Sequence, residues 1–475
     1  MAYQVKTVHK SFREKYIGDR AFYRHVLGIT IPIIIQNFIT NFVGMLDNIM
    51  VGRIGTEQMS GGSIANQLIF VYFLCMFGGL GGIGIFTAQY YGSGDDEGIR
   101  HTFRAKLWLI VVLSVIAVLV LLNFGPSLLQ LFLNDENAQA SMEATLQYGT
   151  EYMRIILLSF PAIAVLQTYA STLRGCGETR MPMIAGVCAV FVNLVFNYLL
   201  IFGKLGFPEL GVRGAAIATV LSRYVEASIC AVYVHTHSEK HTWIQGMYRT
   251  MRVPLTEVKR YISKGTLLLV NESMWSVGMT TLTQCYSMRG LNIIVAFNIA
   301  NTLTQLLNVV LFAMGDAVAI IIGQLLGANK LDEAKDTDNK IIAFGLAFSI
   351  LSMVLLLILG RFFPLIYNTN DEARAMATQV MTVQAFFAPI LAFTHCAYFT
   401  LRTGGKTFVT FLFDSAFTWA ISVPIAFCLS RFTAMPAISM YICVTCADLI
   451  KALIGFFLVR SNIWIVNLAE RPETA

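Results

Sequence analysis

The sequence predicts an all-α polytopic membrane protein, with twelve transmembrane helices in two pseudo-symmetric six-helix bundles. Three observations support this fold class: the composition, the number of long apolar segments, and an internal repeat. Of the 475 residues, 56% are hydrophobic and 13% are charged, and the mean hydropathy is +0.65. Soluble domains carry about 25% charged residues, so this composition excludes an ordinary soluble protein.

Twelve apolar segments are each long enough to cross a hydrocarbon core about 30 Å thick. They lie at 27–51, 63–90, 107–124, 146–170, 183–203, 214–235, 265–288, 293–323, 341–360, 380–401, 408–429 and 437–459. Most lysines and arginines fall on the side of these spans that holds both termini, including Arg13, Arg104, Arg180 and Lys259. This bias predicts a multi-pass protein of the cell's inner or plasma membrane with both termini in the cytoplasm. The net charge of +6 is therefore interpreted as a topology signal, and no nucleic-acid partner is expected.

The chain repeats itself at an offset of about 230 residues. AQYYGSGDDEG (88–98) corresponds to GQLLGANKLDEA (323–334), and LRGCGETR (173–180) corresponds to LRTGGKTF (401–408). Because an even number of spans separates the copies, the repeats are parallel and should be related by an axis along the membrane normal. We predict an N-terminal tail (1–26), a first lobe (27–235), a cytoplasmic linker (236–264), a second lobe (265–459) and a C-terminal tail (460–475).

The first span carries polar residues on one side only. At 100° per residue they fall within about 140° of arc: Gln36, Asn37, Thr40, Asn41, Gly44, Asp47 and Asn48. An aspartate at the centre of a membrane helix costs about 2.5–3.5 kcal/mol on insertion scales. This stripe must therefore face a neighbouring helix or an aqueous cavity.

Three other spans carry polar faces of the same kind. Span eight has Asn298, Asn301, Gln305, Asn308 and Asp316, span seven has Glu272, Ser276, Thr280 and Thr283, and span five has Asn193 and Asn197. Such residues can be interhelical hydrogen-bonding groups worth about 0.6 kcal/mol each, or they can line a transport pathway. For the amides both interpretations remain open, whereas the cost of a lone acid favours a functional role for Asp47 and Glu272.

Other charges inside spans have partners nearby in sequence. Arg223 with Glu226, and Asp448 with Lys451, are spaced i,i+3 and are predicted to be neutralised structural pairs. Asp414 follows the LRTGGKT turn, where water or Arg402 is its expected partner. For His395, an interhelical hydrogen bond is favoured over proton relay.

Enzyme signals are weak in this sequence. Gly79, Gly81 and Gly84 have dinucleotide-fingerprint spacing, but that fingerprint requires a strand before the loop and a helix after it. Glycines such as Gly78 and Gly82 are better explained as positions where helices approach closely. The sequence contains no H-E-x-x-H, G-x-S-x-G or G-x-x-x-x-G-K-[ST] motif. We therefore expect no enzyme activity and no cofactor, and an ion gradient as the energy source.

Several motifs together resemble the multidrug and toxic compound extrusion (MATE) family over roughly residues 20–468. They are P-x(14)-D-x-x-x-V-G in the first span, LRGCGET (173–179), GVRGAAIAT (211–219), the pair Asn271-Glu272, GQLLGA (323–328) and WIVNL (464–468). The resemblance implies a V-shaped pair of bundles that exports amphipathic organic cations in exchange for Na⁺ or H⁺. It also implies that the coupling ion is bound by Asp47, a possible Na⁺ ligand, with Asn193, Asn197 and Thr219.

We expect the substrate to contact polar and aromatic residues of the spans: Gln36, Asn37, Asn41, Glu272, Trp275, Ser276, Asn301, Gln305 and His395. NorM-type members carry an acid in span ten where this chain has Leu391, with His395 one turn further on. This departure favours ion coupling in the first lobe. Asn197 stands where some relatives have aspartate, which favours protons over sodium.

The alternative function is a lipid-linked oligosaccharide flippase of the same wider superfamily. Such proteins usually line their cavity with several arginines that hold a diphosphate. Here the only arginine well inside a span is Arg223, with Glu226 close by. We therefore expect small cationic drugs and membrane lipids as partners, and a chain that functions as a monomer.

Overall fold

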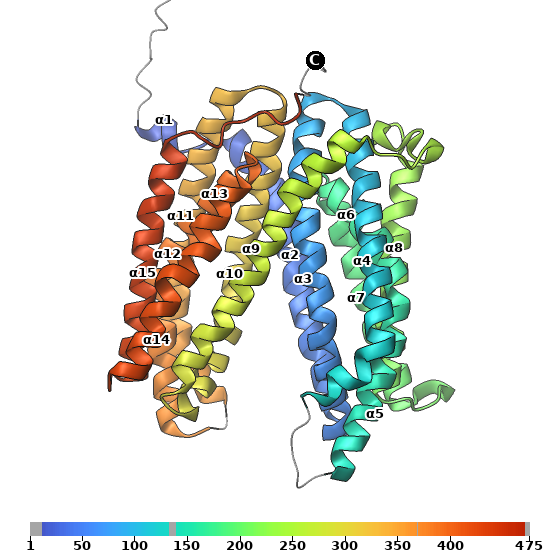
Figure 1. Cartoon of the computed structure of the whole chain (residues 1–475), viewed down its shortest axis with the longest axis vertical. Coiled ribbons are helices and arrows are strands. Elements are labelled where there is room, and N and C mark those ends of the chain that lie inside the picture. The colour runs from blue at the N-terminus through green and yellow to red at the C-terminus, as the bar shows by residue number, and fades with distance from the viewer. Residues whose placement is uncertain (1–11, 133–138, 368, 471–475) are drawn as a thin grey trace, which may run out of the picture. The chain divides into compact units, whose positions relative to one another are not determined.

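The computed structural model describes residues 12–132, 139–367 and 369–470, and every regular element in these ranges is helical (Figure 1). The chain forms two compact units. The N-unit is Pro32–Ser273, and the C-unit is Met1–Ile31 with Met274–Ala475. The all-α prediction is confirmed for the described part of the chain.

The N-unit holds most of the first long helix and the six helices that follow: α2 (Arg20–Gly52), α3 (Thr56–Ser93), α4 (Asp96–Gln130), α5 (Gln139–Ile156), α6 (Phe160–Gly175), α7 (Arg180–Phe202) and α8 (Val212–Thr236). Four short 3₁₀ turns lie in this unit: Leu157–Ser159, Lys204–Gly206, Thr242–Ile244 and Met247–Arg249. The last two belong to the segment between α8 and α9.

The C-unit holds the remaining helices: α1 (Phe12–Tyr16), α9 (Leu255–Ser287, shared with the N-unit), α10 (Leu291–Gly327), α11 (Leu331–Phe362), α12 (Asp371–Thr403), α13 (Thr407–Phe411), α14 (Val423–Phe432) and α15 (Ala437–Arg460). A 3₁₀ turn covers Phe363–Ile366, and two π-helical segments, Leu412–Ala416 and Thr418–Ser422, join α13 to α14. The twelve predicted spans coincide with helical segments, and two of them, 183–203 and 265–288, run one residue past the end of the helix.

Eleven helices of the described residues are long and apolar enough to cross a membrane. The twelfth predicted span lies in α9, whose first turns carry Glu257, Lys259, Arg260 and Lys264 and are therefore polar. At 1.5 Å per residue, a helix of the length of α9 spans about 50 Å, which leaves a charged extension beyond a hydrocarbon core of about 30 Å.

The helix boundaries repeat as the sequence predicts. α2 and α9 are both 33 residues long, and α3 and α10 are 38 and 37 residues long. The turn after α3 has Gly94 at φ 73°, and the turn after α10 has Asn329 at φ 57°. Both residues adopt the left-handed conformation that terminates helices. The Q-x-x-G repeat therefore marks the same helix end in each copy.

Small residues bring the helices of the N-unit together. A Cβ added to Gly82 would lie 2.4 Å from Cα of Gly265, and one added to Gly78 would lie 2.6 Å from Cα of Leu269. α3 and α9 are therefore in backbone contact, as the glycine-packing interpretation predicts.

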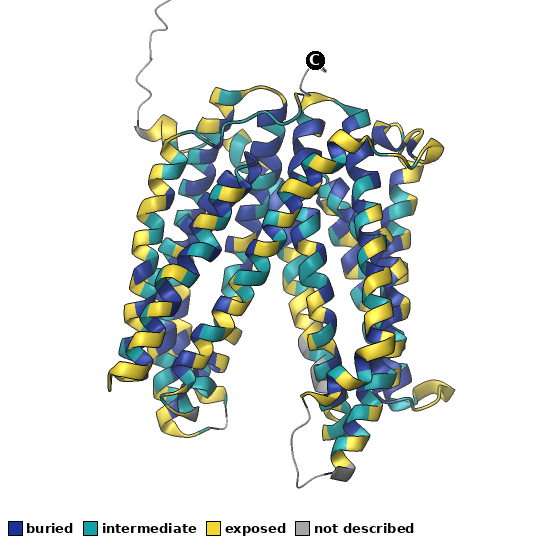
Figure 2. Cartoon of the chain, viewed as in Figure 1, coloured by how far each residue is buried: buried dark blue, intermediate teal, exposed yellow. Residues whose placement is uncertain are grey.

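Large apolar side chains are exposed along the outer faces of several helices (Figure 2). On α4 they are Trp108, Val112, Val115, Ile116, Leu119 and Val120, and on α15 they include Leu449, Ile450, Leu453, Phe456 and Phe457. Contiguous apolar surface of this extent is stable against acyl chains and unfavourable in water.

Candidate functional site: a buried carboxylate and amide cluster

Three helices of the N-unit bring together the four residues predicted to couple the ion. The Nδ2 group of Asn197 on α7 donates to Oδ1 of Asp47 on α2 at 2.6 Å and to Oδ1 of Asn193 at 3.0 Å. Nδ2 of Asn193 in turn donates to Oγ1 of Thr219 on α8 at 3.4 Å. The result is a continuous hydrogen-bonded chain from a carboxylate to a hydroxyl. The functional role of these residues stays a prediction.

The local sequence explains why this chain forms. Asn193 and Asn197 lie one turn apart on α7, so both amides point from the same helix face and both are buried. α8 begins with the small residues of GVRGAAIAT, and a Cβ on Gly214 would lie 2.6 Å from the carbonyl of Leu200. This close approach of α7 and α8 places Thr219 within reach of Asn193.

The oxygen atoms of the cluster suit a proton or a small hard cation. Oδ1 of Asn197 is buried and has no hydrogen-bond partner in the described part of the chain. An amide can exchange its donor and acceptor ends by rotation about its terminal bond. Asn197 can therefore donate to an ionised Asp47, or turn its oxygen toward a cation held by that carboxylate, and oxygen ligands are those that hard cations prefer.

Asp47 itself is half-buried, and no ion pair to it is found among the described residues. Arg223 is the basic side chain whose charge reaches it. Arg223 binds Glu226 at 2.7 Å, as the i,i+3 spacing predicts, so much of its charge is compensated. Within these residues, groups of three His, Cys, Asp or Glu side chains that could hold a metal ion are absent.

A second polar position lies further along α2. A Cβ on Gly186 would lie 3.4 Å from Nε2 of Gln36 and 3.6 Å from Oε1 of Glu226. Gln36 is therefore close to the Arg223–Glu226 pair. Elsewhere on the predicted α2 stripe, Asn37 is half-buried, and the exposed side chains are Thr40 and Asn41. The side chain of Asn48 lies outside the described residues.

Glu272 is half-buried on α9, beside the fully buried Asn271. In the C-unit, Trp275 is exposed and Ser276 accepts a hydrogen bond at its carbonyl from Thr280. These residues lie on one helix, α9, and their substrate role stays a prediction.

α10 has a polar face that is exposed within the C-unit, with Asn298, Asn301 and Gln305 at the surface. Nε2 of Gln384 donates to Oδ1 of Asn301 at 3.3 Å, and Thr304 donates to Gln384 at 2.6 Å. Exposed amides on a membrane-spanning helix are unfavourable against lipid. This face therefore meets water or another polar surface.

His395 on α12 lies between two aromatic rings. The ring centroids of Phe312 and Phe399 are 5.2 and 4.9 Å away. A backbone hydrogen bond joins the imidazole to Phe312 of α10, while Nε2 has no partner in the described structure. The contacts shown are therefore largely apolar.

One charge assignment made from sequence spacing is wrong. Nζ of Lys451 binds Oδ1 of Asp414 at 2.7 Å, and an ion pair of Lys451 with Asp448 is not found among the described residues. Arg402 as a partner of Asp414 stays a prediction. Asp414 lies in the π-helical segment Leu412–Ala416, which packs against α15. A contact between residues 37 positions apart leaves no signal in local spacing. The signal that could have found it is the presence of an acid and a base inside neighbouring spans.

The fold and the cluster define a multi-pass membrane protein made of two copies of one six-helix design, with a single carboxylate held by buried amides in the first copy. The family model described as MatE matches residues 32–199 and 267–428, more than half of the chain. The chain belongs to the MatE family.

Similar proteins cover nearly the whole chain. A probable multidrug resistance protein NorM of Thermotoga maritima is 23% identical over 448 residues, 93% of each chain. A probable multidrug resistance protein YoeA of Bacillus subtilis is 21% identical over 413 residues, 87% of this chain and 88% of the relative. A MATE crystal structure in complex with MaD3S has a TM-score of 0.81 at 20% identity, covering 94% of this chain and 97% of that one. This likeness confirms the predicted fold class.

Proposed function

We propose that the protein is a secondary active antiporter that exports amphipathic organic cations in exchange for H⁺ or Na⁺. The observation that carries this proposal is the 2.6 Å hydrogen bond from buried Asn197 to Asp47, the one acid of α2. Residues 26–46 of that helix contain no charged side chain. The names of the NorM and YoeA relatives support multidrug resistance as the physiological context.

In the proposed cycle, Asp47 exchanges its ion as the site becomes accessible from either side of the membrane. When the carboxylate is ionised and has no cation, Asn197 donates to it. When a proton or Na⁺ arrives, the amide no longer needs to donate, and its oxygen becomes available as a ligand. Moving one charge down a potential of 100 mV supplies about 2.3 kcal/mol, which is enough to drive a modest uphill export step.

Substrate binding is proposed to use the polar and aromatic residues near the acids. Glu272 would provide the negative charge for an organic cation, and the exposed Trp275 would provide an aromatic face. A cation over an indole ring gains about 0.5–2 kcal/mol, depending on desolvation. The substrate role extends to the exposed amides Asn41, Asn301 and Gln305.

The flippase alternative is less well supported. It requires uncompensated basic side chains near the polar cluster to bind a diphosphate. Arg223 is bound to Glu226 at 2.7 Å. The same charge distribution favours a cationic over an anionic substrate.

Efflux of ethidium from cells expressing Asp47→Asn tests the proposal. The matched control is Asp371→Asn, which removes an equally small acid from the surface of α12, where a salt bridge contributes at most about 1 kcal/mol. We expect the Asp47 variant to lose efflux at a normal expression level, and the Asp371 variant to retain it. Wild-type efflux in the Asp47 variant would refute the assigned role.

A further inference from the structure

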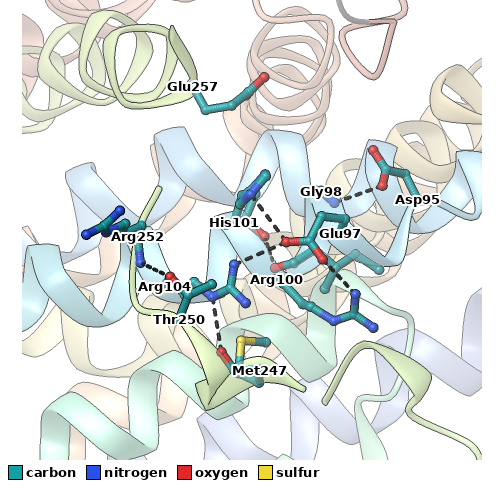
Figure 3. A network of polar contacts seen from close by, with 12 residues as sticks. Asp95, Glu97, Gly98, Arg100, His101, Arg104, Met247, Thr250, Arg252 and Glu257 are labelled. Atoms are coloured by element: carbon teal, nitrogen blue, oxygen red, sulfur yellow. Dashed lines mark hydrogen bonds and ion pairs between the residues drawn. The ribbon is translucent and has the colours of Figure 1, made fainter. Parts of the chain in front are cut away.

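A basic pocket of about 420 Å³ lies in the N-unit, between the first turns of α4 and the segment that follows α8. Figure 3 labels four of its lining residues, Glu97, Arg100, Arg104 and Thr250. Its lining residues are Glu97, Arg100, Arg104, Gln245, Gly246, Arg249 and Thr250. None of them takes part in the Asp47 cluster, so the proposed ion exchange does not account for this pocket.

The pocket is held in shape by a regular set of hydrogen bonds. Nε of Arg100 donates to the carbonyl of Trp243, and Nε of Arg104 donates to that of Met247, both at 3.1 Å. One turn further, Nε1 of Trp108 donates to the carbonyl of Met251, also at 3.1 Å. Because donors and acceptors both advance by four residues, the segment 243–251 lies in fixed register along α4. The pocket is therefore preorganised.

The charges in the pocket do not balance. Glu97 accepts from Nη1 of Arg100 at 2.7 Å and from Nη1 of Arg104 at 3.2 Å, and Nε2 of His101 lies 3.4 Å from the same carboxylate. Arg249 also lines the pocket and has no ion pair in the described part of the chain. The pocket lining thus contains three guanidinium groups and one carboxylate. The excess positive charge suits an anion with several oxygens, because the guanidinium fork matches phosphate geometry.

The helix face that carries these arginines continues into lipid-facing surface. Arg100 and Arg104 are followed at the same spacing by Trp108, which is 50% exposed, and then by the exposed apolar residues Val112, Val115, Ile116 and Leu119. A tryptophan that is half exposed and hydrogen-bonded at its nitrogen is typical of the membrane–water interface. One helical turn separates it from Arg104, about 6 Å along the axis. The pocket therefore lies at the depth of lipid headgroups.

We propose that this pocket binds the phosphate group of an anionic phospholipid whose acyl chains lie along the exposed face of α4. The positive-inside distribution of basic residues assigns the first turn of α4, and with it the pocket, to the cytoplasmic leaflet. Anionic lipids of that leaflet bind to basic pockets. Soluble phosphate shares the charge chemistry, but it would gain nothing from the adjoining apolar surface. A bound lipid would join α4 to the segment that leads to α9.

Binding to the purified full-length protein tests this proposal. The probes are dioleoyl phosphatidylglycerol, dioleoyl phosphatidylcholine and inorganic phosphate, and bound lipid is measured by native mass spectrometry. Arg249→Gln removes one pocket charge without breaking the Glu97 contacts. Arg252→Gln is the matched control, because Arg252 lies in the same segment and points away from Glu97 (Figure 3).

We expect phosphatidylglycerol to bind more tightly than phosphatidylcholine, and its affinity to fall about fivefold in Arg249→Gln but not in Arg252→Gln. Equal losses in both variants would show attraction to general surface charge and would overturn the pocket assignment. Full displacement of phosphatidylglycerol by inorganic phosphate at a similar concentration would show a soluble-anion site and would overturn the lipid assignment. Quenching of tryptophan fluorescence by brominated phosphatidylglycerol, reduced in Trp108→Phe, provides a second measurement in the folded protein.

Discussion

Replacing Asn197 with alanine removes the only side chain observed to donate a hydrogen bond to Asp47 within the described residues. A hydrogen bond to a charged group contributes about 1.5–3 kcal/mol, and at about 1.4 kcal/mol per factor of ten this corresponds to roughly a 10- to 100-fold change in an equilibrium. The bond to Asn193 is neutral and adds about 0.5–1.5 kcal/mol. We therefore expect Asn197→Ala to lower ion-driven efflux by at least about tenfold.

The assay is gradient-driven uptake of a fluorescent cation into everted vesicles, normalised to the amount of transporter in the membrane. Asn123→Ala is the matched control, because that amide is exposed and donates only within its own helix, to the carbonyl of Leu119 at 2.7 Å. The reasoning is refuted if Asn197→Ala transports at the wild-type rate, or if Asn123→Ala loses as much activity as Asn197→Ala.

Two further predictions concern stability in detergent. Gly82→Ala should lower the free energy of unfolding by about 1–3 kcal/mol, because the added Cβ would lie 2.4 Å from Cα of Gly265. Gly84→Ala should leave it unchanged, because a Cβ there has nothing within 4 Å. Thermal unfolding midpoints measure the difference, and equal midpoints in the two variants would contradict close packing at Gly82. Burial lowers the pKa of His241, so the folded state stays neutral while the unfolded state gains a proton below about pH 6.5, and stability should fall as pH drops through this range. His241→Gln should flatten this pH dependence, and an unchanged profile in the variant would be the contrary result.

Much of the fold was predictable because the membrane imposes simple rules on sequence. Each long apolar segment must become a helix, since backbone groups in lipid need partners within the same segment. The duplicated motifs then fixed equivalent helix ends, and the structure shows this at Gly94 and Asn329. The glycines of α3 were also predictable, because closely packed helices require small residues and the observed contact with Gly265 is between backbones.

The Asp47 cluster was partly predictable. The cost of a buried acid singles out Asp47, and the turn spacing of Asn193 and Asn197 places both amides on one face. That the three residues meet depends on how α2 and α7 pack, and the motif resemblance supplied that pairing. Sequence spacing failed for Lys451, because its partner comes from a π-helical segment far away in the chain.

The basic pocket was missed because its residues belong to two segments with little regular pattern in common. Arg100 and Arg104 were interpreted only as topology signals, and the segment near Arg249 only as a link between lobes. The structure shows that the donors on α4 and the acceptors in the segment 243–251 both recur every four residues. The acceptors are the backbone carbonyls of Trp243, Met247 and Met251, so the second segment leaves no signal in its residue types.

We propose that one carboxylate, that of Asp47, exchanges its ion in each transport cycle. The most direct measurement uses purified protein in proteoliposomes, with an imposed gradient of ethidium and no ion gradient, while an internal dye reports H⁺ or Na⁺. We expect ethidium movement to drive an opposite flux of one of these ions, and Asp47→Asn to abolish that flux. Ethidium movement without any ion flux, or full ion flux in the variant, would show that Asp47 does not couple the two.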